Sequence, residues 1–136
     1  MRQTWHDLLF AHWPLSVEAL RPLIPPLFEI DTFDGEAWVS VVPFRMSGIR
    51  PAKLPALPWL SAFPELNVRT YVTLGGANGV RPGVFFFSLE AANPVAVAIA
   101  RRFYHLPYFR AKMSLAETPH GIDYASVRTH AQAAPA

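Results

Sequence analysis

Polar side chains recur at every second position in one short segment of this chain. Glu65, Arg69 and Tyr71 alternate with mainly apolar residues between positions 65 and 74. A period of two is typical of a β-strand, so we expect these three side chains on one face of a sheet. A carboxylate, a guanidinium and a phenol that share a face could bind an anionic or carbonyl compound.

Two other expected strands carry further polar groups. Ser88 and Glu90 share a predicted strand face with Phe86, and Tyr108 and Lys112 share a face of the run that begins at residue 108. If these faces line the interior of a barrel, they form a polar pocket. If they point outward, they are ordinary cross-strand pairs in solvent. The candidate ligand-binding residues are Glu65, Arg69, Tyr71, Ser88, Glu90, Tyr108 and Lys112.

The charges in such a pocket need partners, because an unpaired buried charge is costly. Glu65 and Arg69 lie four residues apart on one strand, which is too far for a close pair. Glu90 and Lys112 are the opposite charges available on other strands. We therefore expect Arg69 to pair with Glu90 and Glu65 to pair with Lys112.

The composition restricts the class of protein. Only 16% of the residues are charged, against about 25% in an average soluble chain, so we expect a partner, a ligand or further chain to cover part of the surface. The net charge of +2 and the lack of cysteine argue against nucleic-acid binding, disulfides and thiol chemistry. No apolar run is long enough for a membrane span, and the N-terminus is a poor signal peptide, so a cytoplasmic location is expected.

No motif for a metal, a cofactor or a known catalytic centre occurs in the sequence. The five histidines do not cluster, and His6 and His12 are not at a metal-ligand spacing. The sequence contains no phosphate loop, GxSxG or HExxH motif. We therefore predict no metal and no cofactor, and the catalytic residues remain unknown at this level.

The elements that must position the candidate residues are mostly strands. The run Val84–Leu89 is apolar and aromatic and has the length of a buried strand. Asn93 is suited to the N-cap of a helix and Pro94 to its first position, which predicts one clear helix at about 94–104. A further strand begins at Tyr108.

Turn and cap signals divide the rest of the chain. Asp34-Gly35 is the strongest hairpin signal, and Ser16 is suited to cap a short helix. We predict a mostly β (α+β) single domain, residues 1–136, with an antiparallel curved sheet or partial β-barrel. Its remaining elements are a strand or turn at 4–13, a helix at Val17–Leu23, and strands at Leu27–Phe33, Glu36–Phe44 and Ile122–His130.

Residues 45–63 are expected to form a long loop. They lack periodicity and contain Pro51, Pro55 and Pro58, together with basic residues and no acid before Phe63. Such a loop is usually a lid, a binding loop or a covering arm, or it packs its own apolar residues onto the domain. We also expect a disordered tail at residues 131–136.

Three stretches resemble the YqjF-like family of uncharacterised bacterial proteins. They are FAHWPLSVEALRPLIPPLFEIDTFDGEAWVSVVPFRMSGIRP, FPELNVRTYV and GVFFFSLEAANPVAVAIARRFYHLPYF. That family is similar in fold to acetoacetate decarboxylase, a cone-shaped, mostly antiparallel β-barrel. Its members are considerably longer, so the resemblance implies a short or truncated member. A second copy or another partner would then cover an open barrel edge.

The resemblance does not extend to the lysine nucleophile of the decarboxylases. Those enzymes form a Schiff base on a lysine whose pKa is lowered by an adjacent lysine, directly after a turn that corresponds to residues 106–107. The next residues here are Tyr108 and Phe109, which cannot form a Schiff base, and Lys112 is out of place. The resemblance matches the decarboxylase's acidic residue with Glu65.

Two functions are compatible with these observations. The first is a small-molecule-binding protein, enzymatic or not, with a polar pocket in a decarboxylase-like β-barrel that lacks the Schiff-base lysine. The alternative is a non-enzymatic interaction module that uses the apolar, basic segment 45–63 and the open barrel edge.

Overall fold

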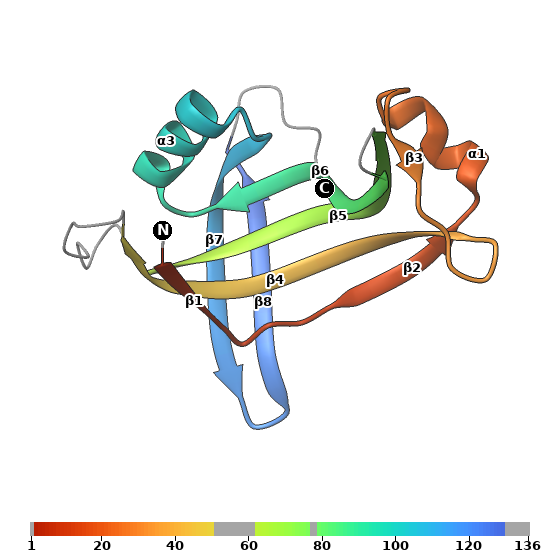
Figure 1. Cartoon of the computed structure of the whole chain (residues 1–136). Helices are drawn as coiled ribbons and strands as arrows, with labels where there is room; N and C mark the ends of the chain where they lie inside the picture. Colours follow the sequence, from red (N-terminus) through yellow and green to blue (C-terminus); the bar gives the residue numbers. More distant parts are fainter. Residues whose placement is uncertain (1, 51–61, 77–78, 130–136) are drawn as a thin grey trace.

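The computed structural model describes residues 2–50, 62–76 and 79–129 (Figure 1). They form a curled, open sheet in the order β1-β4-β5-β6-β7-β8, with β2 paired to β4 and β3 paired to β5. The predicted fold class, a mostly β curved sheet or partial barrel, is confirmed. The strands are β1 (Arg2–His6), β2 (Ala11–Leu15), β3 (Glu29–Ile30), β4 (Ala37–Arg50), β5 (Phe63–Gly76), β6 (Gly79–Ala91), β7 (Tyr108–Thr118) and β8 (Gly121–Arg128).

The helices begin where the capping residues predicted. They are α1 (Val17–Leu20), the 3-10 helix η1 (Arg21–Leu23) and α3 (Pro94–Tyr104). The Asn93 side chain accepts hydrogen bonds from the backbone N–H groups of Val95 and Ala96 at 3.0 and 3.1 Å. These bonds satisfy amides that have no partner within the helix.

Helix α3 connects two strands that lie side by side in parallel. Leu89 of β6 is paired with Tyr108 of β7, and the parallel pairing is short. Strands β7 and β8 then form an antiparallel hairpin that crosses the other strands at a steep angle (Figure 1). This crossing gives the sheet its half-barrel shape.

The hairpin turn at Asp34-Gly35 is present, but its flanking segments pair differently from the prediction. Asp34 and Gly35 both have positive φ, as a tight turn of this kind requires. The segment before the turn is not a long strand against β4. Only β3 forms there, and it pairs with β5. The reason is that β2 already occupies the edge of β4 from Ala37 to Val41.

Part of the predicted loop at 45–63 is β-strand. Strand β4 continues to Arg50 and pairs with β1, and Met46 of β4 also pairs with Phe63 of β5. Residues 51–61, the rest of the segment predicted to be a loop, lie outside the described residues, as does the predicted tail at 131–136.

A β-bulge in β6 changes which side chains share a face. Ser88 is opposite Val68, whereas Phe86 is opposite Arg69, so one residue of β6 is extra at this point. Val68 and Arg69 are consecutive and point to opposite faces. The prediction that Ser88 and Glu90 share a face with Phe86 is therefore wrong.

The sheet has an apolar cluster on each face. On the face that carries Glu65, here called the Glu65 face, Val42 and Phe44 pack under Val97 of α3. On the opposite face, here called the Glu90 face, Leu20 and Ile24 of the α1–η1 segment pack against Ala37 and Val72, among others. The two carboxylates that define these faces are thus separated by the sheet itself.

Candidate functional site

A row of polar side chains runs along β5 on the Glu65 face. Glu65, Asn67, Arg69 and Tyr71 share this face, as their alternation predicted. Glu65 and Asn67 are each only 3% exposed, whereas Arg69 and Tyr71 are half-buried. The row therefore starts in the core beneath α3 and reaches the surface at Tyr71.

The buried end of the row is a carboxyl group paired with a phenol. The Tyr108 hydroxyl donates a hydrogen bond to Oε1 of Glu65 at 3.1 Å. Burial raises the pKa of Glu65 from 4.5 to about 7, and the hydrogen bond from Tyr108 opposes that rise. Burial, and then the nearby Glu65 carboxylate, raise the pKa of Tyr108. At neutral pH, the Glu65 carboxyl group is therefore divided between its protonated and ionised forms.

The middle of the row contains polar atoms without partners. Oδ1 of Asn67 and Nε of Arg69 are both buried and find no hydrogen-bond partner among the described residues. The Arg69 guanidinium instead lies 5.2 Å from the ring centre of Phe10 and 5.9 Å from that of Tyr71. These are distances at which a cation and an aromatic ring attract each other.

The exposed end of the row is a chain of three hydrogen-bonding side chains. The Tyr71 hydroxyl lies 3.0 Å from Oγ of Ser40 and 2.9 Å from Nε2 of His12. Ser40 is fully buried, whereas His12 is exposed. These contacts come from β2, β4 and β5, which lie side by side in the sheet.

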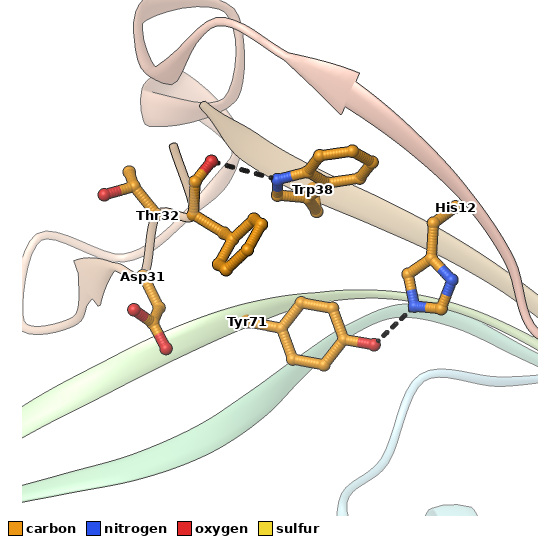
Figure 2. Close-up of a pocket in the computed structure, with 6 residues that line it drawn as sticks. His12, Asp31, Thr32, Trp38 and Tyr71 are labelled. Carbon is orange, nitrogen blue, oxygen red and sulfur yellow. Dashed lines mark hydrogen bonds between the residues drawn. The ribbon is translucent and has the colours of Figure 1, made fainter. Parts of the chain in front are cut away.

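A surface cleft of about 470 Å³ opens beside Tyr71 (Figure 2). Figure 2 shows Tyr71 between His12 and Asp31, which lie at opposite ends of the cleft in this view. The indole of Trp38 is fixed by a hydrogen bond from its Nε1 to the carbonyl of Phe33 at 3.3 Å. The lining residues are His12, Asp31, Thr32, Phe33, Trp38 and Tyr71.

Glu65 cannot contact a small molecule in this cleft. It lies six residues from Tyr71 along β5, which is roughly 20 Å at the rise of an extended strand. The Glu65–Tyr108 pair and the Tyr71 cleft are thus separate features of one face. The cleft end combines aromatic surface with a hydrogen-bonded phenol and imidazole, which suits a small planar ligand.

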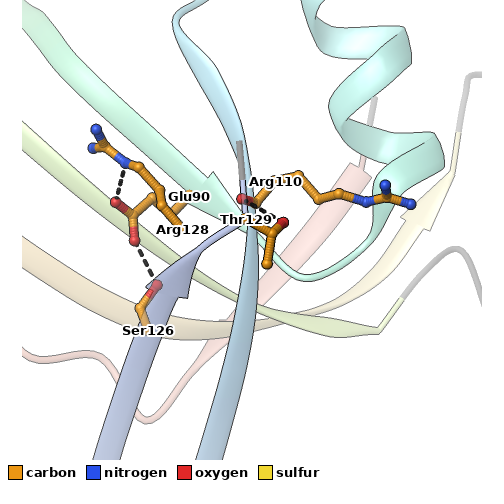
Figure 3. A network of polar contacts seen from close by, with 5 residues as sticks. All are labelled: Glu90, Arg110, Ser126, Arg128 and Thr129. Carbon is orange, nitrogen blue, oxygen red and sulfur yellow. Dashed lines mark hydrogen bonds and ion pairs between the residues drawn. The ribbon is translucent and has the colours of Figure 1, made fainter. Parts of the chain in front are cut away.

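The second predicted carboxylate, Glu90, belongs to a different network (Figure 3). Nε of Arg128 donates to Oε1 of Glu90 at 2.6 Å, and the Ser126 hydroxyl donates to Oε2. Arg128 also lies 4.3 Å from the ring centre of Phe109. This network joins β6 to β8 on the Glu90 face. The expectation that Glu90 pairs with Arg69 is wrong, because the two side chains lie on opposite faces of the sheet.

The structure brings together only part of the predicted set. Glu65, Arg69, Tyr71 and Tyr108 share the Glu65 face, whereas Ser88 and Glu90 lie on the Glu90 face. Lys112 is exposed on β7, and it forms no ion pair among the described residues. The expected pairing of Glu65 with Lys112 is therefore wrong, and a tyrosine takes the place of the lysine.

Sequence reasoning missed His12, Ser40 and Trp38. Trp38 and Ser40 are two positions apart in a predicted strand, so the sequence predicts that they share a face. Their position next to Tyr71 could not be predicted from the sequence, because it depends on the register between β4 and β5. His12 comes from a segment predicted only as a strand or turn. Within the described residues, no three His, Asp or Glu side chains are grouped as metal ligands.

Comparison with known proteins agrees with this architecture. The family model DUF2071, described as an uncharacterized conserved protein, matches residues 2–136. The uncharacterized protein YqjF of Bacillus subtilis (strain 168) is 52% identical over 128 residues, which are 94% of this chain and 51% of that protein. The resemblance drawn from the sequence is thereby confirmed.

The fold likeness extends to a solved enzyme structure. The crystal structure of acetoacetate decarboxylase from Legionella pneumophila matches with a TM-score of 0.66 at 15% identity, over 91% of this chain and 44% of the enzyme. At this identity the match shows a shared fold alone. The chain spans about half the length of either relative. Among the described helices, none is long and apolar enough to cross a membrane.

Proposed function

The chain belongs to the DUF2071 family of uncharacterized conserved proteins, and from this premise we propose that it binds a small carbonyl compound in the cleft beside Tyr71. The fold does not by itself support this proposal, because proteins that share one fold have many different functions. It depends on the chemistry of the cleft itself.

The observation that carries the proposal is the position of the Tyr71 hydroxyl. Its oxygen lies within hydrogen-bond distance of both Ser40 and His12. When both of these groups donate to the phenol oxygen, the phenol hydrogen is free to donate to a ligand. A carbonyl oxygen accepts such a bond, and the faces of Trp38 and Phe33 offer an apolar surface for the rest of the molecule.

The proposed site does not use the imine chemistry of the decarboxylases. Tyr108 and Phe109 occupy the positions where the family resemblance would place the lysines, and neither can form a Schiff base. If the site is catalytic, Tyr71 and His12 are the pair suited to proton transfer. Imidazole and phenol are both common general acids and bases, and a relay within hydrogen-bond distance is what that chemistry requires.

Acetophenone is a suitable first probe, because it combines a carbonyl with a planar ring. We expect saturable changes in the backbone amide resonances of His12, Trp38 and Tyr71 when the ¹⁵N-labelled protein is titrated. Tyr71→Phe removes the donor but keeps the ring. It should raise the Kd about fivefold, which corresponds to one neutral hydrogen bond.

Tyr124→Phe is the matched control, because it removes a phenol that bonds the carbonyl of Asp7 at 2.7 Å, away from the cleft. This variant should bind acetophenone like the wild type. The proposal fails if the resonance changes do not saturate, or if both variants lose affinity equally. Benzoate, the anionic counterpart, tests whether the site prefers a carboxylate instead.

An interaction module is the second candidate, and exposed apolar residues in β2 and in the segment before it favour it. Leu9, Phe10 and Trp13 are 55%, 45% and 52% exposed. Large apolar side chains that remain exposed can belong to a protein interface. A second copy of the chain is the simplest partner. Light scattering over a range of concentrations should then show a dimer that Trp13→Ser disrupts.

A further inference from the structure

A second cleft, separate from the Tyr71 cleft, lies between α3 and β7. Its volume is about 530 Å³. Its apolar wall consists of Pro94, Val97 and Ala98 on α3, and three arginines complete the lining: Arg101, Arg102 and Arg110. All three arginine side chains are exposed to solvent.

The three arginines lack acidic partners in the part of the chain that the structure describes. The ion pairs found there join Arg45 to Asp7 and Arg128 to Glu90. No aspartate or glutamate lines the cleft. Three like charges around one cleft repel each other, and a bound anion relieves this repulsion.

Helix electrostatics explain only part of this arrangement. Arg101 and Arg102 lie in the last turn of α3, where the helix dipole favours cations. Arg110 comes from β7, so the dipole gives no reason for its position. Its backbone carbonyl accepts hydrogen bonds from the amide and hydroxyl of Thr129. Figure 3 shows its side chain extending toward α3.

We propose that this cleft binds the phosphate group of a small, soluble phosphate monoester. Guanidinium groups match phosphate oxygens with paired N–H donors, and several of them can surround a doubly charged group. The apolar wall at Val97 and Ala98 would contact the organic part of the ester. This site is independent of the carbonyl site at Tyr71, and either can exist without the other.

The test is an amide NMR titration of the full chain with inorganic phosphate and with n-butyl phosphate. Both should cause saturable changes at Val97, Ala98 and Arg110, and the butyl ester should bind more tightly. Arg110→Gln should raise the Kd for butyl phosphate about tenfold, whereas Arg81→Gln, which removes an exposed charge on β6, should change it less than about twofold.

Other outcomes would overturn the proposal. An equal loss of affinity for butyl phosphate in the Arg110 and Arg81 variants would mean that binding depends only on the overall charge of the protein. Binding to phosphatidylcholine vesicles that contain phosphatidic acid, without binding to butyl phosphate, would identify a lipid headgroup as the ligand and exclude the soluble ester. If Arg110→Gln does not fold, Arg101→Gln, which also removes one charge from the cleft, provides the same comparison with Arg81→Gln.

Discussion

Glu65 is a carboxyl group placed in an apolar core, where it accepts a hydrogen bond from the phenol of Tyr108. Phe44 and Ala91 are its neighbours on β4 and β6, and both are buried. Its protonated form avoids the cost of burying a charge, which explains why burial raises its pKa. The group therefore makes the stability of the fold depend on pH.

We predict that Glu65→Gln weakens this pH dependence. The pKa is 4.5 in the unfolded chain and about 7 in the fold, so folding favours the protonated form. The resulting stability is fully present below pH 4.5 and is lost as the pH rises through 7. The total is roughly 3 kcal/mol. Glutamine stays neutral and can still accept the hydrogen bond from Tyr108.

Urea denaturation between pH 4 and pH 8 measures the effect. The unfolding free energy of the wild type should decline more steeply with pH than that of Glu65→Gln. Glu117→Gln, which changes an exposed carboxylate on β7, should follow the wild type. If the unfolding free energies of Glu65→Gln and the wild type change equally with pH, burial does not raise the pKa of Glu65, and the prediction is wrong.

At the scale of the element, α3 forms part of both the core and the proposed phosphate cleft. Val97 is 6% exposed and packs into the core, whereas Val95 is 39% exposed. The helix is held at its start by Asn93, whose side chain bonds two amides. Ser16 makes one weaker bond, 3.3 Å long, at the start of α1.

We predict that Asn93→Ala destabilises the protein by about 1 to 2 kcal/mol, because it leaves two amides at the start of α3 without a partner. Ser16→Ala should cost less, about 0.5 to 1 kcal/mol, since it removes a single longer bond. Thermal and urea denaturation give both values. A reversed order would show that the cap does not anchor α3.

At the scale of the whole molecule, the β7–β8 hairpin closes one side of the half-barrel through a few polar contacts. Arg128 and Ser126 bond Glu90 of β6, and the Tyr124 hydroxyl donates to the carbonyl of Asp7. The side chain of Glu90 is 11% exposed and that of Arg128 is 28% exposed. Loss of the arginine would therefore leave a mostly buried carboxylate without its cation.

We predict that Arg128→Met destabilises the protein by about 3 kcal/mol, the lower end of the range for a broken buried ion pair. The double variant Arg128→Met with Glu90→Gln should recover part of this loss, because no charge is then left unpaired. Arg45→Met breaks the pair with Asp7, in which the arginine side chain is 47% exposed, and should cost less, about 1 kcal/mol. Urea denaturation distinguishes these outcomes, and equal losses at Arg128 and Arg45 would contradict the argument.

The features that could be predicted from the sequence are those that depend on local physical chemistry. Asn93 and Ser16 mark helix starts because their side chains satisfy free amides, and Asp34-Gly35 marks a turn because both residues adopt positive φ. The alternation along β5 predicted the shared face of Glu65, Arg69 and Tyr71. The strand, turn and helix signals predicted the curved sheet or partial barrel, and the family resemblance implied the same fold.

The contacts between polar groups depend on how the strands pair and pack. One extra residue in β6 placed Ser88 and Glu90 on the face opposite Arg69, and a bulge of this kind leaves no clear mark in the pattern of residues. The contact between His12 and Tyr71 spans 59 positions of sequence. Such contacts depend on strand order and register, which are set by the packing of the whole sheet. Local sequence preferences therefore predict the faces of the strands but not the site that the faces form together.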